Sequence, residues 1–414
     1  MAKKSILFVH NNFPAQFKFL APALSNEGYD IHVISLRDFE YKNITCHKYE
    51  ITTGTTKNIH KYAIEFEAKM IRAQAVALKS DELKEKGLNP ALIIAHPGWG
   101  ESYFLKEIWP EAKILSYFEF YYNTSNSDID FDPNEEHHQI DGYNVAFKVQ
   151  ARNAPFLKSY TDSDALICPT NFQKNTSPNF LKKKINVIHE GIDTNILKPR
   201  DDFFVEFSDD SGKKIKLTKN DKIVTFVNRN FEPYRGYHKF IEALPNIANN
   251  NPDAYIVLVG GDKVSYGNIP EGNESYKDIF YNRVKDKIIN KDKIIFTGHV
   301  DYKILIALFG ITSAHVYLTY PFVLSWSMLE AMSLGALVIG SKTPPVEEVI
   351  KHNKNGLLID FHDTQGLSKL VNKVLEKKDD YQKLRSEARK TIIDKYDLAS
   401  VCLPKQIELV KSLI

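Results

Sequence analysis

Residues 222–247 read KIVTFVNRNFEPYRGYHKFIEALPNI and contain one complete unit of the fold. The first part, 222–228, is a short run rich in β-branched and aromatic residues, which is typical of a buried strand. Polar residues interrupt this run, and an apolar face with helical spacing then follows at Phe240, Leu244 and Ile247. The stretch therefore predicts a strand, a loop and a helix, the unit from which parallel α/β sheets are built.

The same unit recurs along the whole chain. A polar loop and hairpin around residues 200–221 separates two series of such units, so the sequence predicts an α/β protein with two Rossmann-like parallel sheets. The expected strands of the first series are 5–10, 31–35, 91–95, 112–118, 164–168 and 185–189, and those of the second are 222–228, 254–260, 293–297, 315–319, 336–340 and 356–359.

The length of 414 residues also favours two domains, because a single hydrophobic core rarely organises so long a chain. We expect an N-terminal domain at 1–195 and a C-terminal domain at 196–395. The last segment, 396–414, has a helical pattern without a further strand. A terminal helix of this kind is expected to pack back on the N-terminal domain.

Composition excludes several functional classes. Lys and Arg number 54 against 52 Asp and Glu, and this near balance argues against nucleic acid as a partner. Cys46, Cys168 and Cys402 are scattered and lack metal-ligand spacing, which indicates a reducing compartment and no zinc site. The apolar stretch at 5–10 is too short for a signal peptide or a membrane span, so we expect a cytoplasmic location.

Two arginines follow the strand at 222–228. Arg229 comes directly after Asn228, and Arg235 precedes the helix. Guanidinium groups beside a strand end are suited to bind a diphosphate through paired hydrogen bonds. The alternative is that both arginines are ordinary solvated side chains.

A second candidate site follows the strand at 315–319. Residues 320–332, YPFVLSWSMLEAM, run from this strand end into a helix, whose first free N–H groups favour phosphate. Glu330 lies near the start of that helix, where a carboxylate can accept hydrogen bonds from ribose hydroxyls. Alternatively, Ser327 and Glu330 form a capping box, which is a purely structural role.

The first half carries a third candidate site at two strand ends. His96 begins the segment HPGWGE after the strand at 91–95, and ligands of open parallel sheets bind outside such strand ends. Gly98 and Trp99 in this segment combine room for a ligand with an aromatic surface. The neighbouring strand ends in the aromatic run YFEFYY, whose carboxylate is Glu119. A satisfied structural histidine and a set of core aromatics are the alternatives.

Other motifs are absent or incomplete. Asp128, Asp130 and Asp132 alternate in a polar loop at 124–142, but a calcium loop counted from Asp128 would have Pro133 and Gln139 where Gly and Glu are required. The segment Asn11–Gln16 after the first strand has no Gly-x-Gly-x-x-Gly fingerprint. Gly260-Gly261-Asp262, after the strand at 254–260, matches neither that fingerprint nor a P-loop, and these two observations disfavour nicotinamide enzymes and ATPases.

Taken together, these residues resemble glycosyltransferase family 4, whose members have the GT-B architecture of two Rossmann-like domains facing across a cleft. In the C-terminal half the resemblance rests on Arg229, Arg235-Gly236, Gly298, Leu329–Met332 and Asn355–Leu358, together with His189–Thr194 at the domain boundary. The N-terminal half resembles the branch with the signatures Asn12-Phe13-Pro14, His96–Glu101 and Tyr117–Tyr122.

The resemblance implies a retaining, metal-independent transfer of a sugar from a nucleotide diphosphate sugar, with no resident cofactor. The implied catalytic residues are Arg229, Arg235, His96 and Glu119. The implied donor-binding residues are Asn228, Gly298, Phe322, Val323, Leu324, Ser325 and Glu330, of which Glu330 would bind the ribose. The implied acceptor-side residues are Asn12, Phe13, Gly98 and Trp99.

The chain departs from the family pattern at several positions. Phe322 stands where the family has a second glutamate that contacts the donor sugar. Pro344-Pro345 and Asn11-Asn12 stand where many members have Gly-Gly turns, and Glu119 lies where many members place a histidine. Sugar recognition and acceptor activation are therefore expected to differ from those of the family.

The acceptor is left open as a glycan, a lipid-linked glycan or a protein in glycan or polysaccharide biosynthesis. Lys18 and Phe19 would give peripheral contact with the inner face of the membrane if the acceptor is lipid-linked. The alternative functions are a nucleotide-sugar epimerase or a phosphorylase on the same scaffold, and a sugar-binding or scaffolding protein without activity.

Overall fold

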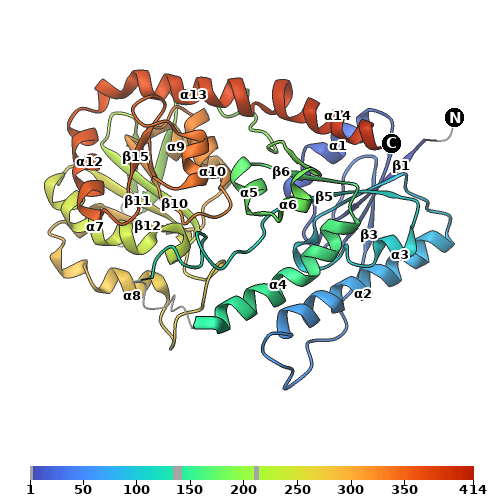
Figure 1. The fold of residues 1–414 in the computed structure, drawn as a ribbon. Coiled ribbons are helices and arrows are strands. Elements are labelled where there is room, and N and C mark those ends of the chain that lie inside the picture. The colour runs from blue at the N-terminus through green and yellow to red at the C-terminus, as the bar shows by residue number, and fades with distance from the viewer. Residues whose placement is uncertain (1–2, 134–141, 209–213) are drawn as a thin grey trace. The chain divides into compact units, whose positions relative to one another are not determined.

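The computed structural model describes residues 3–133, 142–208 and 214–414, which form two compact units (Figure 1). Within the described residues, the first unit contains 3–125, 142–191 and 398–414, and the second contains 126–133 and the chain from Ile192 to Asp397. Each unit is built around one parallel sheet. The expectation of two parallel-sheet α/β domains is therefore confirmed.

The first sheet has seven strands in the order β3-β2-β1-β4-β5-β6-β7. These are β1 (Ser5–Val9), β2 (Asp30–Ser35), β3 (Ile44–Lys48), β4 (Leu92–Ala95), β5 (Lys113–Tyr117), β6 (Ala165–Cys168) and β7 (Ile185–Val187). All six pairs of neighbouring strands are parallel. Strand β3 was not predicted, because its sequence ITCHK is only partly buried and has no continuous apolar run.

Helices cover both faces of this sheet. Side chains of β1 alternate between the two faces, as the pleat requires. Ile6 and Phe8 pack in the core with α1 (Leu20–Asn26) and α14 (Leu403–Leu413), whereas Leu7 and Val9 pack in the core with α2 (Ile64–Glu85) and α3 (Leu105–Ile108). The remaining helices of the unit are α4 (Gly142–Asp162), α5 (Asn171–Thr176) and α6 (Asn179–Lys182).

The last helix, α14, is a full part of the first unit. Val410 is buried in the same core as β1 and α1, and the Gln406 Nε2 donates a hydrogen bond to the carbonyl of His189 at 2.9 Å. A π-helical turn at Leu398–Cys402 precedes α14. The chain passes from one unit to the other between residues 191 and 192 and between 397 and 398.

The second sheet has six strands in the order β12-β11-β10-β13-β14-β15. These are β10 (Ile223–Asn230), β11 (Tyr255–Gly261), β12 (Ile294–Gly298), β13 (Ala314–Tyr317), β14 (Val338–Ser341) and β15 (Leu357–Ile359). All its neighbouring strands are parallel as well. The predicted hairpin consists of β8 (Phe204–Ser208) and β9 (Lys214–Thr218), which pair antiparallel.

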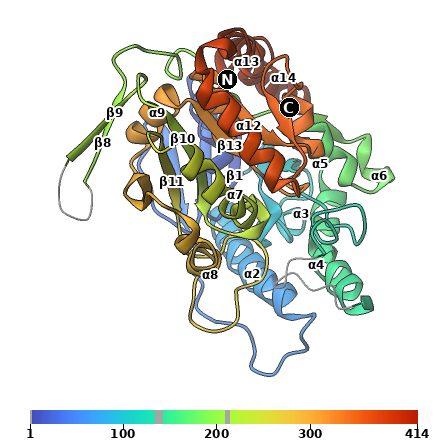
Figure 2. The same cartoon turned by 90° about the vertical axis from the view of Figure 1, so that its left-hand side faces the viewer.

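Helices also cover the second sheet on both faces. On one face, α7 (Tyr237–Asn250) stacks Phe240 on Phe226 of β10 at 4.5 Å between ring centroids, and α12 (Thr364–Glu376) lies beside α7 (Figure 2). The other core contains residues of α9 (Tyr302–Ile311), α10 (Trp326–Ser333) and α13 (Gln382–Tyr396). Two further helices are α8 (Tyr276–Asn282) and α11 (Pro344–Val349).

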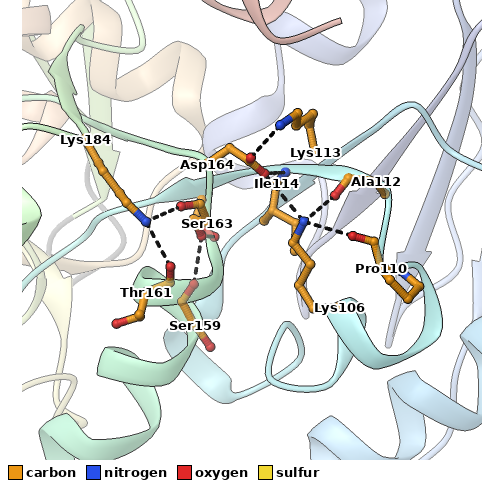
Figure 3. Close-up of polar contacts among 11 residues, drawn as sticks. Lys106, Pro110, Ala112, Lys113, Ile114, Ser159, Thr161, Ser163, Asp164 and Lys184 are labelled. Atoms are coloured by element: carbon orange, nitrogen blue, oxygen red, sulfur yellow. Dashed lines mark hydrogen bonds and ion pairs between the residues drawn. The ribbon is translucent and has the colours of Figure 1, made fainter.

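Hydrogen bonds and ion pairs connect the amino end of β5 to the amino end of β6 (Figure 3). The Asp164 carboxylate, directly before β6, accepts hydrogen bonds at 2.9 Å from the Ile114 N–H and from the Lys113 Nζ of β5. Lys106 and Lys184 donate to backbone carbonyls at the same edge. The candidate site lies at the opposite edge of the sheet, where the carboxyl ends of the strands are.

Asp164→Asn is expected to lower the free energy of unfolding at pH 7 by about 1–2 kcal/mol, since hydrogen bonds to a charged group are lost. Burial raises the pKa of Asp164, but the Ile114 N–H and the cations of Lys113 and Lys106 outweigh it, so the pKa lies below 3.8. The stabilisation is therefore present above pH 3.8 and lost as pH falls through the lower folded-state value. Urea unfolding at pH 7 and pH 3 should show a smaller difference at pH 3.

The matched control is Asp201→Asn, because Asp201 is exposed and pairs with Lys219 on the surface. This variant is expected to change the free energy of unfolding by less than about 0.5 kcal/mol. Equal stability of Asp164→Asn and the wild type at pH 7 would contradict the assignment.

Candidate functional site

Both sheets reverse their strand order at one point, which lies between β1 and β4 in the first unit and between β10 and β13 in the second. In open parallel sheets, ligands bind outside the carboxyl ends of the strands at such a switch point. His96 follows β4, whereas Arg235 and Val323 follow β10 and β13. The predicted site residues therefore flank the switch point of their own unit.

Arg235 is the more firmly held of the two predicted arginines. It ends a short 3-10 turn, Pro233–Arg235, and is only 7% exposed. Its Nη1 donates to the Thr319 Oγ1 at 2.9 Å and to the Val323 carbonyl at 3.0 Å. Among the described residues, no carboxylate lies within ion-pair distance of Arg235. A buried cation in a fixed position and without an acidic partner is suited to bind an anion.

Gly236 allows this placement of Arg235. Its backbone has a positive φ of 68°, and a Cβ built on it would lie 2.3 Å from the Cβ of Leu318. The loop after β10 therefore lies directly against the end of β13, and only glycine fits at this position. Asn228 contributes from the strand, since its Nδ2 approaches the Arg235 carbonyl at 3.5 Å.

Arg229 differs from Arg235 in its surroundings. It is the penultimate residue of β10 and is exposed, and its side chain makes no hydrogen bond or ion pair with the part of the chain that the structure describes. Only one of the two predicted arginines is thus held in place by the protein. Arg229 remains available to a ligand at the strand end.

Glu232 organises a loop beside Arg235. Its buried Oε2 accepts hydrogen bonds from the N–H groups of Ser265 at 2.6 Å and Tyr266 at 3.1 Å. Burial raises the pKa of Glu232, against the opposing effects of these hydrogen bonds and of the charges of Arg235 and Arg229. The Tyr266 ring is thereby brought to 5.2 Å from the Arg235 guanidinium.

Phe322 belongs to an aromatic wall around Arg235. It is 3% exposed, and its ring lies 5.0 Å from that of Tyr266 and 5.5 Å from that of Tyr234. The Arg235 guanidinium carbon lies 6.0 Å from the Phe322 ring. The position at which the family resemblance expects a glutamate is therefore apolar and packed.

The loop before α10 presents free backbone groups. Ser325 is the N-cap, and its side chain accepts a hydrogen bond from the Ser327 N–H, so the alternative capping box of Ser327 and Glu330 is wrong. The Ser325 N–H itself donates to the Tyr317 hydroxyl at 2.9 Å. The N–H groups of Val323 and Leu324 have no partner within the described residues. These two groups lie beside the Arg235 contact and favour an anion.

Glu330 and Gly298 occupy the two other predicted positions of this unit. Glu330 lies on α10, where its Oε1 accepts a hydrogen bond from the Tyr302 hydroxyl at 2.7 Å. Gly298 ends β12 with a φ of 66°, and no atom lies within 4 Å of a Cβ built on it. The structure places Glu330 next to α9, which begins at Tyr302, four residues after Gly298.

In the first unit the structure brings His96 and Glu119 together. His96 is fully buried, and its Nδ1 accepts a hydrogen bond from the Gly98 N–H at 3.1 Å, so the proton lies on Nε2. This Nε2 is 3.7 Å from the Oε2 of Glu119, whose side chain is 39% exposed. Burial, followed by the nearby charge of His10, lowers the pKa of His96 well below 6.5. His96 is therefore neutral at pH 7 and directs an N–H toward the carboxylate.

The other acceptor-side residues differ in exposure. Trp99 is partly exposed, and its ring lies 5.0 Å from that of His96. Gly98 packs so closely that a Cβ would lie 2.6 Å from the His96 ring. The Asn12 N–H donates to the Nδ1 of His10 at 2.8 Å. Phe13 is buried in the hydrophobic core, against Phe39, and does not line an open surface.

Sequence reasoning missed several residues of these sites. His10 lies at the switch point, 5.0 Å from the His96 ring, but its position inside an apolar run gave no signal. The Tyr49 hydroxyl donates to the buried Glu101 carboxylate at 3.1 Å, and burial raises the pKa of Glu101 to about 7. Tyr234 and Tyr266 contact the Arg235 site from loops without a motif. Only the fold brings such residues together.

None of the described helices is both long and apolar enough to cross a bilayer. No group of three or more metal-binding side chains is found among the described residues. Asp130 of the acidic loop instead accepts hydrogen bonds from the N–H groups of Asn126 and Ser127.

Comparisons with solved structures show the fold. A sucrose-phosphate synthase from Thermosynechococcus elongatus superposes with a TM-score of 0.75 at 15% identity, with 99% of each chain covered. HepE from Anabaena, in complex with UDP-glucose, superposes with a TM-score of 0.67 at 14% identity, again with 99% of each chain covered.

Curated sequences align with only part of this chain and with only part of their own length. An uncharacterized glycosyltransferase from Methanocaldococcus jannaschii is 27% identical over 183 residues, which are 44% of this chain and 43% of that protein. Spore coat protein SA from Bacillus subtilis is 23% identical over 211 residues, which are 50% of this chain and 54% of that protein. The chain spans about half the length of the curated relatives it matches.

Two family models match successive parts of the chain. The model for the glycosyl transferase family 4 group matches residues 27–197, and the model for glycosyl transferases group 1 matches residues 208–391. The two matches cover both sheets except for β1. Both halves of the chain therefore match glycosyltransferase domains, the first those of the family 4 group and the second those of group 1.

Proposed function

We propose that this protein transfers a sugar from a nucleotide diphosphate sugar to an acceptor hydroxyl with retention at the anomeric carbon. The observation that supports this proposal most directly is the setting of Arg235. Its buried guanidinium has no acidic partner among the described residues and lies beside the free N–H groups of Val323 and Leu324. A diphosphate supplies the negative charge that this site lacks.

In the proposed reaction, the bond between the anomeric carbon and the diphosphate oxygen breaks, and its electron pair remains on that oxygen. The acceptor hydroxyl attacks the same face of the sugar, and its proton passes to the departing phosphate. Arg235 and Arg229 stabilise the growing negative charge, which is the role that a metal ion has in other transferases. The proposed reaction therefore requires no metal and no resident cofactor.

Glu330 is proposed to accept hydrogen bonds from the donor ribose, and Gly298 to let the nucleoside approach the end of β12. Tyr302 then competes with ribose for the Glu330 carboxylate, because it already donates to that group. Since the structural relative HepE has been solved with UDP-glucose, uridine diphosphate and UDP-glucose are the first probes to use. The aromatic wall at Phe322 is proposed to alter the choice of sugar.

The acceptor is proposed to bind at the switch point of the first unit. Glu119, which faces the N–H of His96 and is partly exposed, is placed to contact an acceptor hydroxyl. Asn12, Gly98 and Trp99 would line this region. A glycan, a lipid-linked glycan or a protein remains the proposed acceptor, with a cytoplasmic enzyme at the inner membrane face in the lipid-linked case.

The decisive experiment is a thermal-shift screen of nucleotide sugars, followed by mass analysis and NMR of the products. Soluble glycans, proteins and lipid-linked glycans in vesicles serve as acceptors. We expect one donor to raise Tm and to give a product with the donor's anomeric configuration. An inverted product would exclude retention, and donor interconversion without acceptor would indicate an epimerase. A strict need for free phosphate would indicate a phosphorylase, and no donor use at all would indicate a binding protein.

A further inference from the structure

Residues 126–133, here called the 126–133 segment, lie in the first half of the sequence but pack within the second unit. The expected N-terminal domain, 1–195, included this segment. Asp128 and Asp132 of the segment are both 0% exposed. Burial of two carboxylates is costly unless strong partners surround them. The residues that contact these two carboxylates indicate the role of the segment.

Asp128 binds the residue directly before Arg235. Its Oδ2 accepts a hydrogen bond from the Tyr234 hydroxyl at 2.8 Å, and both side chains are buried. The Tyr234 carbonyl in turn accepts from the Tyr320 N–H at 2.9 Å, which ties the loop after β10 to the loop after β13. Asp128 therefore holds the junction of the two loops that Arg235 bridges.

Asp132 binds both sides of the same junction. Its Oδ2 accepts from the His238 Nε2 at 2.9 Å and from the Tyr320 hydroxyl at 3.3 Å. The Lys239 Nζ adds positive charge at 3.9 Å from the Asp132 Oδ2, and the His362 Nδ1 lies 3.7 Å from the Asp132 Oδ1. His238 and Lys239 lie in the first turn of α7, where the helix dipole also favours a carboxylate.

Burial raises the pKa of Asp132, but the hydrogen bond from His238 and the charges of His238, Lys239 and His362 outweigh it and hold the pKa below 3.8. Asp132 is therefore an anion at neutral pH. The Tyr234 and Tyr320 rings that the two aspartates hold lie 4.8 Å apart. The Tyr234 ring also contacts that of Phe322 in the aromatic wall.

We propose that Asp128 and Asp132 are positioning residues for the diphosphate site, acting through Tyr234, Tyr320 and His238 on the loops that fix Arg235. This inference rests on the proposed function, because it assigns the site around Arg235 to a diphosphate. The 126–133 segment is thus part of the donor-binding unit. The contacts of Asp128 and Asp132 lead to the loops around Arg235, so we expect the segment to act on the diphosphate end of the ligand.

The test measures the affinities for uridine diphosphate and for uridine by calorimetry. Asp128→Asn and Asp132→Asn are each expected to weaken binding of uridine diphosphate about tenfold and to leave binding of uridine within twofold. A loss confined to the diphosphate separates positioning from general destabilisation, which would change both affinities. The matched control is Asp253→Asn, an exposed aspartate paired with Lys222, and it is expected to change neither affinity.

Two further variants cover the case in which a buried asparagine prevents folding. Tyr320→Phe removes only the hydroxyl that donates to Asp132, and Tyr234→Phe removes only the hydroxyl that donates to Asp128. Each variant should weaken the binding of uridine diphosphate and leave the binding of uridine unchanged within twofold. The double variant Asp128→Asn/Tyr234→Phe should lose little more affinity than either single variant, because both changes break the same hydrogen bond.

The possible failures are distinguishable. Binding of uridine diphosphate by the wild type together with unchanged affinity in all these variants would overturn the inference and leave the proposed function intact. Equal losses for uridine and uridine diphosphate would also overturn it. A wild type that binds neither uridine diphosphate nor any other nucleoside diphosphate would overturn the proposed function, and the inference with it.

Discussion

Arg235→Ala is expected to lower kcat/KM for the nucleotide-sugar donor at least about a hundredfold, which corresponds to about 3 kcal/mol of transition-state stabilisation. The reason is that Arg235 is held by Thr319 and Val323 and needs no rearrangement when charge develops on the leaving diphosphate. Steady-state kinetics with the donor identified in the screen provide the measurement.

Arg235→Lys is the informative companion to this variant. A lysine keeps the positive charge but lacks the planar guanidinium group. It therefore cannot donate to Thr319 and to the Val323 carbonyl and contact the ligand at the same time. We expect an intermediate loss, about tenfold, if position and charge both contribute. Arg229→Ala should cost less than Arg235→Ala, since the protein does not hold the Arg229 side chain. Near-normal turnover of Arg235→Ala would exclude the proposed role.

Gly236→Ala is expected to reduce the free energy of unfolding by about 3 kcal/mol, from the positive φ and from the overlap with Leu318. A Cβ at this position lies 2.3 Å from the Cβ of Leu318, which neither the loop nor β13 can relieve without moving. Urea unfolding measures the effect. The affinity of the folded variant for the donor should fall as well, because the loop has to move away from Leu318 and this movement displaces Arg235 from Thr319.

The matched control is Gly87→Ala. Gly87 also has a positive φ, but no atom lies within 4 Å of a Cβ built on it. Its substitution should therefore cost only the backbone strain, about 1 kcal/mol. Equal costs at the two positions would show that the contact with Leu318 relaxes freely, and this would contradict the close packing described for the loop.

Every strand that the sequence predicted lies within two residues of its expected range. This holds for the fully buried β4 and β13 and also for the only partly buried β12, because each has a short apolar run that a local pattern reveals. Strand β3 was not predicted, because its sequence ITCHK has no continuous apolar run and its pairing with β2 depends on tertiary structure. Local patterns thus identified all six strands of the second sheet and six of the seven strands of the first.

The candidate site was predicted less evenly. Arg235 and the loop before α10 were identified because they follow strands, and strand ends are where parallel sheets bind ligands. Asp128 and Asp132 were read only as a polar loop, since their partners Tyr234 and His238 lie about a hundred residues later in the chain. Tyr266 carried no signal at all, because its role depends on two hydrogen bonds from the backbone to Glu232. Long-range contacts of this kind have no local pattern.

The packing of the 126–133 segment limits how this chain can be recombined with relatives. A chimera joined near residue 192 would take the 126–133 segment from one parent and Tyr234, His238 and Tyr320 from the other. Compatible parents therefore need matching aspartates in the first half and matching partners in the second. The unit of exchange is the stretch from Ile192 to Asp397 together with the 126–133 segment, whereas 398–414 stays with the first unit.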